Sequence, residues 1–169
     1  DERLMATPAV AMERCHEVTM NMGFTSVRAT RNAMHELKNH DGKRAESIRE
    51  DERTADRYED ELGTYLVKLS GCHLSDQDRV EGEAAELLHM IGDFERISDH
   101  AVNILESTEE LRGKGIAFTQ PAIEEMSKMF GAVDEIMDLA LTAFIHGDIS
   151  AAKEVETLEQ VVDTLKEQL

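Results

Sequence analysis

The chain has 169 residues, a length that suits one domain of ordinary size. Its 36 acidic residues outnumber 18 basic ones, and a formal net charge of −18 repels nucleic-acid phosphates and anionic lipid, so nucleic acid is not expected as a partner. Hydrophobic residues make up 41% of the chain, enough for a core, yet no apolar run approaches the roughly 20 residues that a membrane-spanning helix needs, so we expect no direct membrane insertion.

Helix-forming residues dominate the chain, which has only two prolines and 4% aromatic residues. Thr7 followed by Pro8 predicts an N-cap and the start of a helix that extends to about Lys38. A break over residues 39–42 separates it from a second predicted helix over residues 43–69.

The second half of the chain shows the same kinds of boundary. Ser75 with Asp78 resembles the start of a third helix, which continues to about residue 111. Thr119 and Pro121 open a fourth helix, and a break at residues 147–148 separates it from a fifth. Long helices joined by short loops predict an all-α antiparallel helical bundle.

The sequence also contains an internal repeat. Shifting the chain by 107 residues aligns six pairs: Asp41 with Asp148, Ala45 with Ala152, Ile48 with Val155, Glu52 with Glu159, Asp56 with Asp163, and Leu62 with Leu169. Helices one and two therefore correspond to helices four and five, and the third helix should have a sixth as its counterpart. Since the chain opens at Asp1 and stops within a helical pattern, we expect it to be a piece of a longer protein.

Three predicted helices carry carboxylates beside their apolar stripe. These are Glu52, Asp56 and Glu59 on the second helix, Glu95, Asp99 and Glu106 on the third, and Glu159 and Asp163 on the fifth. Acids four residues apart repel one another mildly, whereas a bound cation would make the spacing favourable. In a chain with 36 acids, the same pairs also arise by chance as solvated surface groups, so both interpretations stay open.

The segment DFERISDHAVNI, residues 93–104, resembles the signature helix of PhoU proteins, the phosphate-uptake regulators, usually seen as ERIGDHAxNI. Ser98 stands where this signature usually has glycine, a change that we expect to matter little. The opening DERLMATPAVAMER and the segment ELGTYLVKLS are further similar to the cytoplasmic tail of bacterial sodium/phosphate cotransporter family proteins.

The resemblance implies a fold of repeated three-helix units. It describes residues 1–169 as a single PhoU-like domain, with repeat one at 8–112 and an incomplete repeat two at 119–169. Family members bind metal clusters through E(D)xxxD motifs, which implies metal ligands at Glu52, Asp56, Glu95 and Asp99. Glu159 and Asp163 are the corresponding ligands of the second repeat, whose partners would come from the missing helix. Iron and zinc are the candidate metal ions.

The resemblance also implies a function. We expect a non-catalytic regulatory domain in phosphate transport and phosphate homeostasis, the soluble cytoplasmic part of a sodium-dependent phosphate transporter that is tethered to the inner membrane in the full-length protein. Its expected partners are the membrane transporter domain or phosphate-signalling proteins. The apolar face left without a sixth helix makes a homodimer a further candidate assembly.

Two alternative functions are open. Glu13 with His16 and Glu86 with His89 form ExxH pairs, the motif of ferritin-like di-iron carboxylate proteins. Both pairs point away from the apolar stripes, which favours exposed surface histidines. A metal-free helical interaction domain is the other alternative, with the acidic flanks as ordinary surface.

Other residues with reactive or charged side chains receive structural interpretations. His100 points away from the acidic pair and from the apolar stripe, so we expect a surface position. Cys72 and His73 are predicted loop residues, because adjacency alone does not create a nucleophilic cysteine. Three arginines form a row on the second helix, and we expect them to pair with acids of the same helix: Arg49, Arg53 and Arg57 with Glu46 and Glu50.

Overall fold

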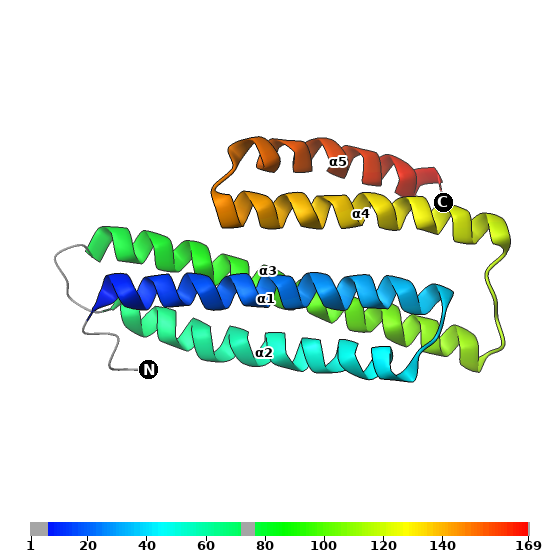
Figure 1. Cartoon of the computed structure of the whole chain (residues 1–169), viewed down its shortest axis with the longest axis horizontal. Helices are drawn as coiled ribbons and strands as arrows, with labels where there is room; N and C mark the ends of the chain where they lie inside the picture. Colours follow the sequence, from blue (N-terminus) through cyan, green and yellow to red (C-terminus); the bar gives the residue numbers. More distant parts are fainter. Residues whose placement is uncertain (1–6, 72–76, 169) are drawn as a thin grey trace.

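The computed structural model describes residues 7–71 and 77–168 (Figure 1). Within these ranges the chain forms five helices and no strand: α1 (Pro8–Lys38), α2 (Gly42–Ser70), α3 (Gln77–Gly113), α4 (Gln120–His146) and α5 (Ile149–Gln168). The predicted all-α helical bundle is therefore confirmed. Ser75, Cys72, His73 and Leu169 lie outside the described residues, so the predictions on them stay as they were.

Local capping explains several helix boundaries. At the start of α2 the Asp41 side chain accepts a hydrogen bond from the Lys43 N–H at 2.9 Å. Asp148 accepts in the same way from the N–H of Ser150 at 2.8 Å, just before α5. These aspartates were aligned by the internal repeat, and each satisfies a backbone donor that a helix start leaves unpaired.

Helices α1, α2 and α3 pack against one another along their lengths and contain most of the core. The apolar stripe predicted for the third helix is buried, with no member more than 9% exposed: Leu87, Ile91, Phe94, Ala101 and Leu105. Full burial of one such large side chain stabilises the fold by about 1.5–3 kcal/mol. The three-helix unit is thus the well-packed part of the molecule.

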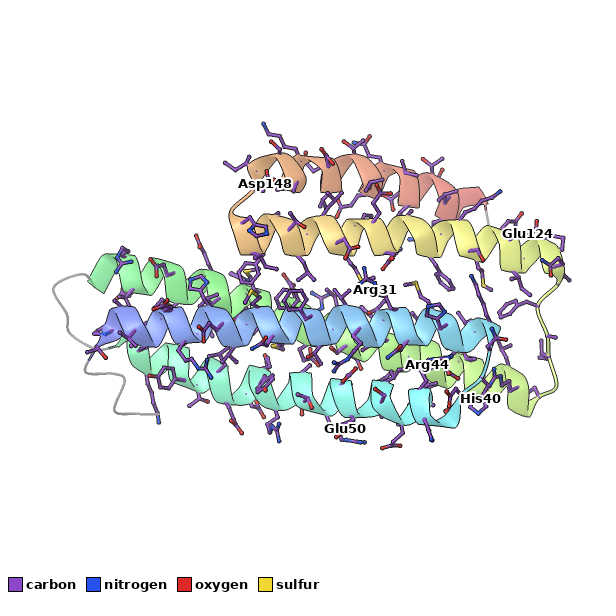
Figure 2. The ribbon with its side chains drawn as sticks, viewed as in Figure 1. Arg31, His40, Arg44, Glu50, Glu124 and Asp148 are labelled. Atoms are coloured by element: carbon purple, nitrogen blue, oxygen red, sulfur yellow. The ribbon has the colours of Figure 1, made fainter. Side chains whose placement is uncertain are left out.

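Helices α4 and α5 form an antiparallel hairpin, and α4 lies along α1 (Figure 1). The Arg31 side chain of α1 lies between α1 and α4 (Figure 2). It pairs with two carboxylates of α4, Asp134 at 2.5 Å and Asp138 at 2.6 Å. About two turns earlier on α1, Leu141 of α4 and Phe94 of α3 approach the backbone of Gly23 closely. The hairpin is therefore attached mainly through one face of α4.

The apolar residues of the hairpin are less buried than those of the three-helix unit. In the described part of the hairpin, only Met137, Leu141 and Ala151 are buried hydrophobic residues. The stripe predicted for the fifth helix, Leu158, Val162 and Leu165, is half-buried, because only α4 packs extensively against α5. The division into one complete and one partial repeat stays a prediction. No helix in the described ranges has both the length and the apolar character that crossing a bilayer requires.

Candidate functional site

Carboxylates of α2 and α3 face one another across the interface between these two helices. The group consists of Glu52, Asp56 and Glu59 on α2 and Glu95 and Asp99 on α3, and we call it the acidic row. Glu52, Glu59 and Glu95 are half-buried, while the two aspartates are exposed. The four residues for which the resemblance implies metal ligation in the first repeat therefore lie on facing sides of α2 and α3, with Glu59 beside them, and metal ligation by them stays a prediction.

The ionisation of the row shows that its charges act on one another. Burial raises the pKa of Glu52 above its ordinary value, and the negative charges of Asp56 and Asp99 raise it further. Burial likewise raises the pKa of Glu95, assisted by Asp99 on its own helix and Glu59 on α2. Because each ionised carboxylate opposes the next, a cation is the ligand that this environment favours.

Nearby cations do little to neutralise the row. Arg53 lowers the pKa of Glu52, but burial and the acids outweigh it, and its guanidinium bonds to Glu46 at 3.0 Å. Arg49 bonds to Glu109 of α3 at 2.6 Å, so the prediction that this arginine pairs within its own helix was wrong. The guanidinium of Arg57 lies 5.9 Å from the centre of the Tyr58 ring. Among the described residues it forms no ion pair with an acid of the row.

The donor chemistry of the row suits an oxygen-preferring cation, since all five side chains are carboxylates. Among residues 7–71 and 77–168, however, no three Asp, Glu, His or Cys side chains converge closely enough to hold a metal ion. The carboxylates as they stand therefore do not form a closed set of metal ligands. Asn103 donates to Asp99 Oδ2 at 3.1 Å and so orients one of these acids.

A comparison with protein families decides what this bundle is. The family described as "PhoU domain" matches residues 19–108 and 126–169, which is most of the chain. The chain belongs to the PhoU domain family. No match was found among curated proteins or among solved structures. A PhoU domain suggests a regulatory role in phosphate homeostasis, and the family is regulatory and not enzymatic.

Ser98 of the PhoU signature helix makes a contact with α1 that the sequence did not predict. Its side chain is fully buried, and its hydroxyl donates to Ser26 Oγ of α1 at 2.9 Å. The Ser26 hydroxyl in turn donates to the carbonyl oxygen of Phe94, with 2.8 Å between the two oxygens. The hydroxyl therefore joins two helices, a contact that glycine could not make, and the expectation that serine at position 98 matters little stays a prediction.

We expect Ser98→Gly, which restores the residue usual in the signature, to lower the free energy of unfolding. The lost hydrogen bond costs about 1 kcal/mol, and glycine within a helix costs roughly 0.5–1 kcal/mol more than alanine. Urea unfolding of wild type, Ser98→Ala and Ser98→Gly separates the two contributions. Equal stability of Ser98→Ala and wild type would show that the hydroxyl contact is not stabilising.

The acids of the second repeat lie apart from the acidic row. Glu159 and Asp163 are exposed on α5, which lies on the opposite side of the molecule from α2 (Figure 1). Glu159 lines a groove of about 510 Å³ between the hairpin and α3, together with Arg96 and His100 of the signature helix. No described carboxylate row faces this pair, and its role as a metal site stays a prediction.

The ExxH pairs do not have the geometry of a di-iron site. Glu13, His16, Glu86 and His89 are all exposed, as predicted, whereas ferritin-like ligands project into the bundle interior. The His16 ring stacks on Phe144 of α4 with 6.3 Å between ring centres. The PhoU family match also gives no support to a ferritin-like protein.

Proposed function

We propose that this PhoU domain is the cytoplasmic regulatory part of a sodium-dependent phosphate transporter, tethered to the inner membrane, and that it binds cations along the acidic row. The observation that supports cation binding is the row itself. Carboxylates from two helices face one another, two of them are half-buried with raised pKa values, and no basic side chain among the described residues neutralises them fully.

Glu52 and Asp56 on α2 and Glu95 and Asp99 on α3 are the proposed ligands, with iron and zinc among the ions to test. An all-carboxylate donor set also suits manganese and magnesium. Ligands on two helices give a means of regulation, because cation binding would replace repulsion between α2 and α3 by attraction. A changed angle between these helices would alter the surface offered to the transporter's membrane domain or to phosphate-signalling proteins, the proposed partners.

Metal analysis of the purified protein tests this proposal. We expect wild type prepared without chelator or affinity-tag metal to carry or take up at least about one ion per chain, and a variant with Glu95→Gln and Asp99→Asn to lose it. A variant with Glu46→Gln and Glu50→Gln removes two exposed charges from α2 outside the row and should keep the metal. Wild type that takes up no iron, zinc, manganese or magnesium would exclude the cation function and favour a metal-free interaction domain.

Partner binding tests the regulatory part of the proposal separately. The affinity of the domain for the transporter's membrane part should differ between cation-loaded and chelated protein. Equal affinities in the two states would contradict regulation through the acidic row.

Light scattering in both states would test the homodimer, which the half-buried apolar face of the hairpin favours.

A further inference from the structure

A pocket of about 240 Å³ lies where the ends of α1 and α3 meet the segment that links α3 to α4 (Figure 1). Its two charged lining residues are both basic, Lys38 of α1 and Arg112 of α3, and no carboxylate of the described residues lines it. The whole chain carries a net charge of −18. A pocket lined by basic side chains is therefore an exception on this protein, and it suits an anion.

The end of α3 builds the apolar wall of this pocket. Gly115 has a φ of +67°, and the N–H groups of Gly115 and Ile116 donate to the carbonyl oxygens of Arg112 and Leu111, each at 2.9 Å. These two bonds form a Schellman motif, in which the chain turns back over the last helical turn. Ile116 and Phe118 thereby come to line the pocket, yet they are 54% and 40% exposed. A ligand with an apolar group would cover part of this surface.

The guanidinium of Arg112 lacks partners that its burial requires. Its Nη2 donates to the carbonyl oxygen of Glu36 at 3.2 Å, whereas Nη1 is buried and has no hydrogen-bond partner among the described residues. The acids on neighbouring turns are engaged elsewhere, Glu36 with Arg44 at 3.0 Å and Glu109 with Arg49 at 2.6 Å. A half-buried charge without a counter-ion and a buried N–H without an acceptor both oppose folding, and one bound oxyanion would remove both costs.

An oxyanion fits these groups better than water does. Water would accept a hydrogen bond from Arg112 but would leave its charge uncompensated. A guanidinium presents a planar fork of N–H groups that matches the oxygens of a carboxylate or a phosphate. Lys38 is exposed and forms no ion pair within the described ranges, so it adds a second positive charge to the pocket. Apolar side chains make up much of the remaining lining, which favours an organic anion over an inorganic one.

We propose that this pocket binds a small organic oxyanion, a carboxylate or a phosphate monoester that carries an apolar group. Arg112 and Lys38 bind its oxygens, and Phe118 packs against its apolar group. Such a ligand contacts α1, α3 and the segment that leads to α4, so it restrains the hairpin where the hairpin joins the three-helix unit. The inference does not depend on the acidic row, whose last member on α3, Asp99, lies between three and four turns before Arg112.

Isothermal titration calorimetry with four probes tests the ligand class. Benzoate and phenyl phosphate carry an apolar ring, while acetate and inorganic phosphate offer similar head groups without it. We expect the ring to tighten binding about 10-fold for the preferred head group, and the tighter of the two aromatic probes identifies that head group. Phe118→Ala should remove most of this gain. No binding of either aromatic probe at millimolar concentration would overturn the proposal, and so would equal binding with and without the ring.

Charge variants test the site itself. Lys38→Gln and Arg112→Gln should each weaken binding of the aromatic probes about 10-fold, the loss typical of a charge-assisted contact. Lys38 is exposed, so Lys38→Gln should fold normally even if loss of the bond to the Glu36 carbonyl unfolds Arg112→Gln. Lys153→Gln is the matched control, because it removes an exposed lysine of α5 that does not line the pocket. Unchanged affinity in Lys38→Gln, or an equal loss in Lys153→Gln, would overturn the assignment.

Discussion

Removing one charge from the acidic row should stabilise the metal-free protein. For Glu95→Gln we expect the free energy of unfolding to rise by about 0.5–1 kcal/mol, because the variant no longer repels Asp99 on its own helix or the acids of α2. For a chain of this size that is an increase in Tm of about 2 °C. Glu86→Gln, which changes an exposed glutamate elsewhere on α3, should alter the Tm less.

A bound cation should make wild type more stable than Glu95→Gln. With Mn²⁺ at about 100 times its Kd, wild type should gain about 2.7 kcal/mol from binding alone. Glu95→Gln should gain less, because it has lost a ligand. Thermal unfolding of both proteins, in chelator and in Mn²⁺, measures the four values. A destabilised Glu95→Gln in chelator would contradict the repulsion that we infer.

The difference in stability between Glu95→Gln and metal-free wild type should decrease as the pH falls. The pKa of Glu95 is raised in the folded protein, so its ionised form costs folding free energy at any pH above that pKa. As the pH falls through the raised pKa, folded wild type takes up a proton before the unfolded chain does, and the cost disappears. The advantage of Glu95→Gln over metal-free wild type should therefore be largest near neutral pH and vanish in acid. An advantage independent of pH would exclude charge repulsion as its cause.

A methyl group at position 23 should loosen the attachment of the hairpin to the three-helix unit. A Cβ on Gly23 would lie 2.8 Å from Leu141 Cδ2 and 2.9 Å from Phe94 Cζ, closer than real Cβ contacts. We expect Gly23→Ala to cost about 1–3 kcal/mol, the usual range for overpacking a core. The Arg31 ion pairs to α4 lie two turns further along α1 and should weaken with it.

Hydrogen exchange and urea unfolding measure this effect, with Gly92→Ala as the matched control. A Cβ at Gly92 meets no atom within 4 Å, so alanine there should stabilise α3 by about 0.5–1 kcal/mol through helix propensity alone. We expect faster exchange in α4 and α5 for Gly23→Ala than for Gly92→Ala. Unchanged exchange in the hairpin would show that the close approach at Gly23 does not hold it.

The sequence by itself determined the helices, because each depends on local signals. The breaks at residues 39–42 and 147–148 predict where α2 and α5 begin, and apolar residues at helical spacing predict the buried stripe of α3. The acidic row was also foreseeable, since its members lie on one side of each helix. The PhoU signature within α3 pointed to the family that the comparison then showed.

Only the tertiary structure decided which residues meet across helices. Periodicity says which side of a helix a residue occupies but not what it touches, so it predicts neither the bond from Ser98 to Ser26 nor the pairing of Arg49 with Glu109 of α3. The bonds from Ser26 to Phe94 and from Arg112 to Glu36 join residues far apart in the chain, and no local pattern marks them. The half-buried stripe of α5 follows for the same reason, because burial depends on which other elements are present to cover a helix face.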